Sequence, residues 1–107
     1  MVDLGQLLTT AAKRGASDVH LKVGNYPHLR VEGSLFRLDQ FGRVSQADAS
    51  EILDEITTPA QRESFDIQSE LDLSFGVKGI GRFRVSVFMQ RGSISLSLRL
   101  IPRYVPS

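Results

Sequence analysis

Apolar residues spaced three and four apart predict three helices in this chain. The first lies near the N-terminus and ends at Gly15, a residue suited to the left-handed conformation of a helix C-terminus. The second begins at Ser45, with Asp48 three residues later as an aspartate version of a capping box. The third begins at Thr58, which is followed by proline, and is a short helix through Phe65.

Alternation of apolar and polar residues predicts strands in the rest of the chain. The first hairpin turns around Gly33-Ser34, and the last third is all strand. The resulting order is α-β-β-β-α-α-β-β-β, which indicates an α+β domain with an antiparallel sheet and helices packed on one face. The predicted strands cover residues 18–23, 28–32, 35–38, 71–75, 82–89 and 93–100.

The alternation of apolar and polar residues in the last two strands predicts the register in which they pair with each other. With a two-residue turn at Arg91-Gly92, every apolar residue on one face meets an apolar residue of the other strand. The same register puts Arg84 directly opposite Arg99 on the other face, with Arg82 one step along. Opposed like charges destabilise a strand pair, and no acidic residue occurs in either strand. Either a carboxylate from elsewhere pairs with each arginine, or an external anion such as phosphate fills the gap.

Composition limits the possible classes of protein. The chain has 107 residues, 41% of them hydrophobic, which fits one globular domain. It has no cysteine, which excludes disulfides and thiolate metal sites. No apolar run is long enough for a membrane-spanning helix, and the N-terminus does not resemble a signal peptide.

Charge is distributed unevenly along the chain. Residues 1–72 contain 7 basic and 12 acidic side chains, whereas residues 73–107 contain 6 basic side chains and no acid. Five of those six cations are arginines, which bind phosphate and carboxylate groups in a bidentate manner. The strip either pairs with the acidic part of the chain or binds an anionic ligand.

Several functional motifs are absent or do not fit. No lysine is followed by Ser or Thr, so there is no P-loop, and the glycines between the strands do not open a helix. Ser17, Asp18 and His20 lie too close on one strand to form a catalytic relay, so the first two are expected to serve the turn after the helix. We expect His20 to make a local hydrogen bond, and His20 and His28 to bind no metal. The near-neutral charge and few aromatics argue against nucleic-acid binding.

Four short motifs together resemble the N-terminal part of type IV pilus retraction ATPases, the PilT family. They occur in family order and span nearly the whole chain. They are Ala16-Ser17-Asp18-Val19-His20, Pro27-His28-Leu29-Arg30-Val31-Glu32-Gly33, Glu70-Leu71-Asp72-Leu73-Ser74-Phe75, and Gly81-Arg82-Phe83-Arg84-Val85 followed by Arg99-Leu100-Ile101-Pro102.

The resemblance implies a PAS-like N-terminal domain over residues 1–101 and, over residues 102–107, the start of a linker to a RecA-like ATPase domain that follows. It implies a cytoplasmic, hexameric twitching-motility motor that uses ATP and Mg²⁺ and works with the pilus machinery at the inner membrane. The domain would pack against ATPase domains of its own and neighbouring subunits. The short leader before the first motif favours retraction over extension motors.

The resemblance also implies a role for the arginines. Arg84 and Arg99 match family positions that approach the nucleotide phosphates held by the ATPase domain. Arg82 matches the first arginine of the same motif. Arg91, which lies in the turn, is the weakest of the four candidates for contact with the phosphates. The fragment itself would be no enzyme and would bind no cofactor tightly. Independently of the resemblance, replacing Arg84 or Arg99 by Ala should leave the stability of the isolated domain unchanged or slightly higher, because it relieves the repulsion between the two side chains. The alternatives are a domain of a pilus extension or type II secretion ATPase, or a free-standing PAS-like ligand-binding domain.

Overall fold

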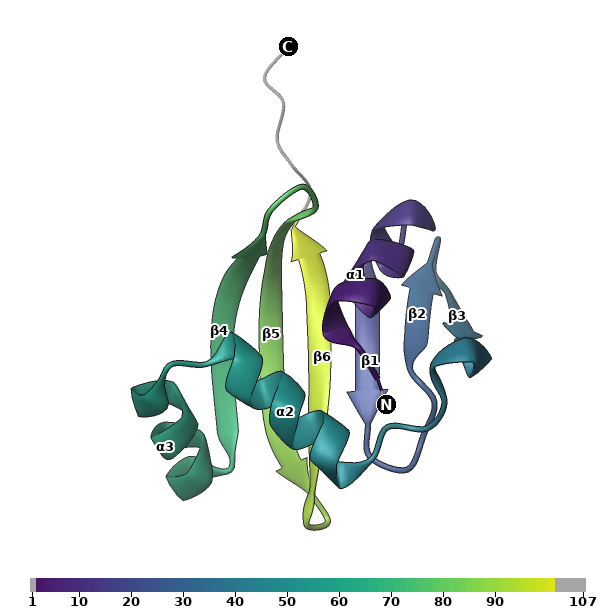
Figure 1. The fold of residues 1–107 in the computed structure, drawn as a ribbon. Helices are drawn as coiled ribbons and strands as arrows, with labels where there is room; N and C mark the ends of the chain where they lie inside the picture. Colours follow the sequence, from purple (N-terminus) through teal and green to yellow (C-terminus); the bar gives the residue numbers. More distant parts are fainter. Residues whose placement is uncertain (1, 102–107) are drawn as a thin grey trace.

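A computed structural model describes residues 2–101 and confirms the α+β class (Figure 1). The predicted linker at residues 102–107 lies outside the described residues. Three helices and six strands follow one another in the predicted order, and a 3-10 turn that the sequence pattern did not predict precedes the second helix. They are α1 (Leu4–Lys13), β1 (Asp18–Lys22), β2 (His28–Val31), β3 (Ser34–Arg37), η1 (Asp39–Phe41), α2 (Gln46–Ile56), α3 (Pro59–Gln68), β4 (Glu70–Val77), β5 (Gly81–Gln90) and β6 (Ser93–Ile101).

The six strands form one antiparallel sheet in the order β3-β2-β1-β6-β5-β4. β1 and β6 pair at the centre, although they come from opposite ends of the chain. Helices α1 and α2 lie across one face of the sheet, and α3 lies at the edge beside β4 (Figure 1). We call the face under α1 and α2 the covered face, and the other the open face.

Local sequence signals set the helix ends. The backbone of Gly15 has φ 69°, and the amides of Gly15 and Ala16 donate to carbonyls of the last turn of α1. Ser45 and Asp48 form the predicted capping box of α2, and Thr58 caps α3 ahead of the proline. The predicted helix starts at Ser45 and Thr58 are therefore confirmed.

The structure corrects several predicted boundaries. Strand β4 covers Glu70–Val77 rather than residues 71–75. Helix α3 continues to Gln68, beyond Phe65, and ends at Ser69 in a left-handed conformation without a glycine signal. The β2–β3 turn is Glu32-Gly33 rather than Gly33-Ser34, and both turn residues have positive φ. A glutamate is strained there, but a turn at this position lets all four residues of β3 pair with β2, and the cross-strand pairing outweighs the local preference.

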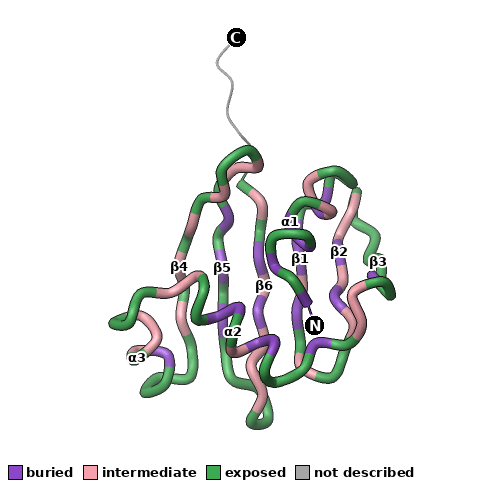
Figure 2. Tube along the Cα trace, viewed as in Figure 1, coloured by how far each residue is buried: buried purple, intermediate pink, exposed green. Residues whose placement is uncertain are grey.

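The core lies between the covered face and the helices (Figure 2). Apolar side chains of α1 and α2 meet those of the central strands, and alternate residues of β5 and β6 are almost completely buried. The fully buried larger side chains include Leu7, Leu8, Ile52, Leu53, Phe65, Phe83, Leu96 and Leu98. Burying them is the main favourable contribution to folding.

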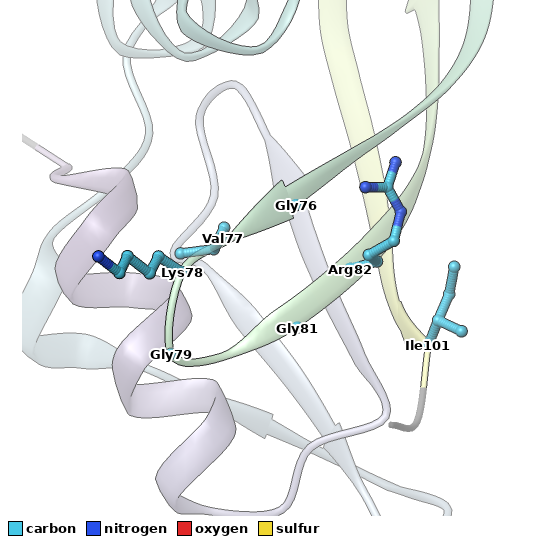
Figure 3. A pocket seen from close by; sticks show the side chains of 7 residues that line it. All are labelled: Gly76, Val77, Lys78, Gly79, Gly81, Arg82 and Ile101. Atoms are coloured by element: carbon cyan, nitrogen blue, oxygen red, sulfur yellow. The ribbon is translucent and has the colours of Figure 1, made fainter. Parts of the chain in front are cut away.

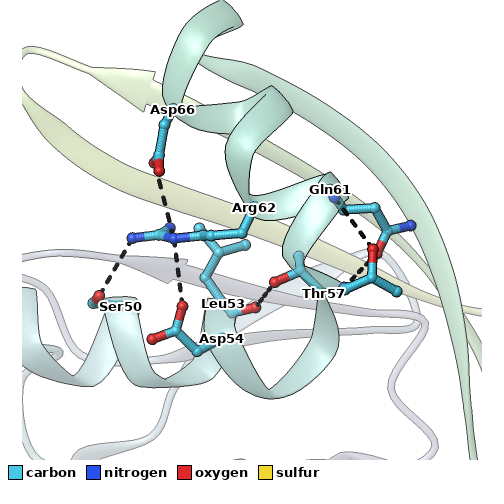
Figure 4. A network of polar contacts seen from close by, with 8 residues as sticks. Ser50, Leu53, Asp54, Thr57, Gln61, Arg62 and Asp66 are labelled. Carbon is cyan, nitrogen blue, oxygen red and sulfur yellow. Dashed lines mark hydrogen bonds and ion pairs between the residues drawn. The ribbon is translucent and has the colours of Figure 1, made fainter.

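Arg62 joins the two helices at the α2–α3 junction (Figure 4). Its Nε lies 3.3 Å from Oδ1 of Asp54 on α2 and 3.8 Å from Oδ1 of Asp66 on its own helix. Its Nη2 lies 3.5 Å from Oγ of Ser50, and its guanidinium carbon lies 5.9 Å from the centre of the Phe65 ring. These contacts fix α3 against α2 at the edge of the core.

Candidate phosphate-binding face

The open face has a different chemical character from the covered face. On β5 and β6 the buried positions alternate with exposed Arg82, Arg84, Phe88 and Arg99. In the part of the chain that the structure describes, α1 and α2 lie on the opposite side of the sheet (Figure 1). The side chains of the open face are therefore free to contact a ligand or another protein surface.

The predicted register of the last hairpin is confirmed. Arg84 is the direct partner of Arg99, and Arg82 is the partner of Ile101 one step along the same face. The apolar pairs of the covered face also match, as in Val85 with Leu98. Two guanidinium groups thus lie on neighbouring strands of a rigid hairpin, as a phosphate clamp would require.

Asp18 provides the carboxylate that the last two strands lack. It is the β1 partner of Arg99, and its Oδ1 accepts a hydrogen bond from Arg99 Nε at 3.1 Å. Ser17 Oγ donates to Asp18 Oδ2 at 2.7 Å, and the Asp18 side chain is 9% exposed. The expectation that Ser17 and Asp18 serve the helix turn is therefore wrong. The backbone of Ser17 bonds to Arg30 and Leu100 of the neighbouring strands, and β1–β6 pairing brings Asp18 beside Arg99.

The pKa of Asp18 is below its usual value. Burial acts to raise the pKa, but the hydrogen bonds from Ser17 and Arg99 and the positive charge of Arg99 outweigh that effect. The carboxylate is therefore ionised at neutral pH and holds the Nε edge of Arg99.

Arg84 has no such partner. Within residues 2–101 it forms no ion pair, and the ion pairs there involve Arg37, Arg62 and Arg99. Arg84 lines a surface basin of about 300 Å³ together with Asp18, Ser86, Ser97 and Arg99. Its charge is the unneutralised one in this basin, so an incoming anion would meet Arg84 directly.

Arg82 lies at the end of the sheet, over a glycine (Figure 3). Its Nη2 lies 3.2 Å from Ser74 Oγ, and its strand partner is Gly76. A Cβ atom at Gly76 would approach Arg82 Nη1 to 3.2 Å, so the missing side chain makes room for the guanidinium. Arg82 and Lys78 border a second basin of about 470 Å³ beside Ile101.

Arg91 does not join the other arginines. It occupies the β5–β6 turn with φ 52°, at the opposite end of the hairpin from Arg84. The two are seven residue steps apart along the chain, which is about 23 Å in an extended strand. The structure brings Arg84 and Arg99 together, places Arg82 next to them and leaves Arg91 apart.

His20 lies further along the open face. Its Nδ1 is 3.3 Å from the hydroxyl of Ser97, which is far away in the sequence but adjacent on β6. The expected hydrogen bond exists, but its partner is not local. The pKa of His20 is lowered, mainly by partial burial, with further repulsion from Arg30 and His28 and an opposing attraction from Asp18.

No helix within residues 2–101 is long and apolar enough to cross a bilayer. Among the same residues, no three His, Asp or Glu side chains gather into a metal-binding cluster.

Sequence comparison finds relatives among pilus ATPases. No protein-family model matches the chain. The chain is 36% identical over 104 residues to the type IV pilus retraction ATPase PilT of Pseudomonas aeruginosa, covering 97% of this chain and 30% of that protein. It is 28% identical over 106 residues to the type IV pilus ATPase PilU of the same organism. The chain therefore spans 30% or less of the length of these relatives.

Structure comparison agrees. A crystal structure of the pilus retraction motor PilT with bound ADP superposes with a TM-score of 0.90 at 34% identity, covering 99% of this chain and 31% of that one. The Legionella pneumophila ATPase DotB superposes with a TM-score of 0.80 at 22% identity, which shows a shared fold. Both matches place the likeness in one region of a longer protein.

Proposed function

We propose that this chain, which is homologous to the N-terminal region of PilT, is the N-terminal domain of a hexameric pilus retraction motor. The likeness to PilT extends over 97% of the chain in sequence and 99% in structure. PilT is described as a pilus retraction motor with bound ADP, so ATP and Mg²⁺ are the cofactors proposed for the longer protein. The domain would act in the cytoplasm, against the pilus machinery at the inner membrane.

The proposed contribution of this domain is positive charge for the ATP phosphates. The observation that supports it is the pair of Arg84 and Arg99 on the open face, with Arg84 lacking a carboxylate partner among residues 2–101. In phosphoryl transfer the protein acts mainly by positioning and by neutralising charge on the transferring group. An arginine outside the P-loop supplies that charge without forming the nucleotide site itself.

The two arginines would make different contributions to phosphate binding. Asp18 holds Arg99 through Nε, which fixes the guanidinium while its two Nη groups stay available to an anion. Arg84 has its full charge to offer, and Arg82 extends the positive edge toward Ile101. Arg91 has no part in the proposed contact because it lies at the far end of the hairpin.

The open face would also determine how the domain packs in the hexamer. ATP bound by a RecA-like ATPase domain has to approach the open face for the arginines to reach its phosphates. The face would therefore meet an ATPase domain of the same or a neighbouring subunit. A pilus extension or type II secretion ATPase would use the same face, and pilus retraction assays would distinguish these motors.

The test is ATP turnover of the full-length protein with Arg84→Ala. Turnover per folded hexamer is expected to fall by about 10–10³-fold, below the larger effects of arginine fingers because two arginines share the charge. Arg91→Ala is the matched control, since it removes the same side chain from the same hairpin. Equal turnover of the two variants would refute the role of Arg84.

A second measurement concerns the 107-residue chain alone. It is expected to hydrolyse no ATP and to bind it in the high micromolar range or more weakly, because it lacks a P-loop. Micromolar affinity for ATP by calorimetry would instead favour a free-standing ligand-binding domain.

A further inference from the structure

The two histidines of the chain meet on the open face. His20 on β1 is the direct cross-strand partner of His28 on β2, and the sequence contains no other histidine. Their strand neighbours Val19, Leu21 and Leu29 are buried in the core, so both imidazoles lie on the side away from the helices. Both also line a surface basin of about 520 Å³.

Hydrogen bonds orient the ring nitrogens. His28 Nδ1 lies 2.8 Å from the carbonyl oxygen of Tyr26. A carbonyl can only accept, so Nδ1 bears the proton and Nε2 keeps a free lone pair. His20 Nδ1 lies 3.3 Å from the Ser97 hydroxyl, whose oxygen can accept a hydrogen bond from Nδ1–H in the same way. Metal-binding histidines are held by this kind of second hydrogen bond.

We propose that His20 and His28 together bind one divalent transition-metal ion, zinc or copper, through their Nε2 atoms. Directly opposed residues of an antiparallel pair have Cβ atoms about 4.5–5.5 Å apart. Two imidazoles on such a pair can converge on one ion at Zn–N distances of about 2.0–2.1 Å. Imidazole is a preferred ligand of both metals, and water completes the coordination.

The surrounding charges are compatible with a cation. Asp18 lies two residues from His20 on the same face, and its side chain is ionised. Two cations oppose it. Arg30 Nη1 is bonded to the Gly33 carbonyl at 2.9 Å, at the turn end of β2, and the exposed Lys22 at the end of β1 lines the same basin. Sequence spacing gave no sign of this site, because it is strand register that makes the two histidines neighbours. The proposal does not depend on the nucleotide role of Arg84.

Calorimetric titration of the 107-residue chain with zinc chloride at pH 7.5 tests the site. One ion per chain is expected. His20→Gln and His28→Gln should each weaken binding by about 10–100-fold, as losses of metal-site groups do. Ser95→Ala is the matched control, because Ser95 lines the same basin without an imidazole. Melting curves of the metal-free variants check that each one is folded.

A spectroscopic readout counts the ligands. Electron paramagnetic resonance of the Cu²⁺ complex should show two coordinated imidazole nitrogens in the parent chain and one in either single variant. The proposal is wrong if Zn²⁺ binding survives in the variant lacking both histidines. It is also wrong if each single variant binds as tightly as the parent chain.

Discussion

The two faces of the sheet are made by the same strands but follow different physical rules. On β5 the covered face holds Phe83 and Val87, each 1% exposed, whereas the open face holds Arg84 and Phe88. The covered face gains its free energy from packing against α1 and α2. The open face contributes little to that packing. Core packing therefore does not restrict its side chains, which can be charged or polar.

This difference explains how the fold tolerates two opposed arginines. Water and salt screen the repulsion between Arg84 and Arg99 on an exposed surface. Asp18 also neutralises part of the charge through its contact with Arg99. A like-charge pair that would strongly destabilise the core therefore costs little free energy where the sheet meets solvent. The contrast between the two faces leads to four predictions.

The largest expected effect comes from two phenylalanines of one strand. Phe83→Ala should lower the free energy of unfolding by about 3–5 kcal/mol, because Phe83 is 1% exposed and stacks on Phe75. Phe88→Ala should cost less than about 1 kcal/mol, because Phe88 is 38% exposed on the open face. Urea denaturation of both variants measures the difference, and similar losses would mean that the open face also supports the core.

Asp48 holds α2, one of the helices that cover the sheet, and should show the next largest effect. Burial acts to raise the pKa of Asp48, but hydrogen bonds from Ser45 and the Val2 amide outweigh this and lower it. A lowered pKa in the folded state adds stability above the unfolded pKa and loses it as pH falls through the folded value. Asp48→Ala should cost about 1–2 kcal/mol at pH 7.

The pH dependence of stability tests whether the ionised carboxylate of Asp48 is responsible. Between pH 7 and pH 2 the parent chain should lose stability chiefly below about pH 4, and the gap between it and Asp48→Ala should narrow there. Melting temperatures across this range measure the gap. A constant gap at every pH would show that Asp48 stabilises α2 without its charge.

Replacing Arg99 or Arg84 compares the stability contribution of an arginine that has an ion-pair partner with that of an arginine that has none. Arg99→Ala should lower the stability of the 107-residue chain by up to about 1 kcal/mol, because it leaves the Asp18 carboxylate without its ion pair. Arg84→Ala should leave stability unchanged or slightly higher, because it removes only repulsion. The structure thus revises the sequence expectation for Arg99 and keeps it for Arg84. Equal melting temperatures of the two variants would argue against the Asp18 contact.

The smallest expected effect concerns the turn that joins the two strands of the last hairpin, β5 and β6. Arg91 has φ 52°, a conformation that asparagine adopts more readily than arginine. Arg91→Asn should therefore raise the free energy of unfolding by about 0.5 kcal/mol. Gly92→Ala, at φ 79°, is the opposite control and should lower it. Chemical denaturation resolves both, and a destabilised Arg91→Asn variant would mean that the arginine side chain itself supports the turn.

The sequence alone determined the local features of this protein. Capping residues located the starts of α2 and α3, and the alternation around Arg91-Gly92 set the register that places Arg84 opposite Arg99. These features depend on residues close together in the chain, where helix caps, two-residue turns and side-chain alternation act directly. The same short range explains why they could be predicted without knowing the rest of the fold.

The tertiary structure alone decided which distant segments meet. Pairing of β1 with β6 brings Asp18 to Arg99, and pairing of β1 with β2 brings His20 to His28. Several antiparallel arrangements satisfy the same alternation, and the choice between them depends on closing long loops and filling one shared core. The partner of Arg99 and the histidine pair therefore could not be read from spacing, because both arise from strand order in the complete sheet.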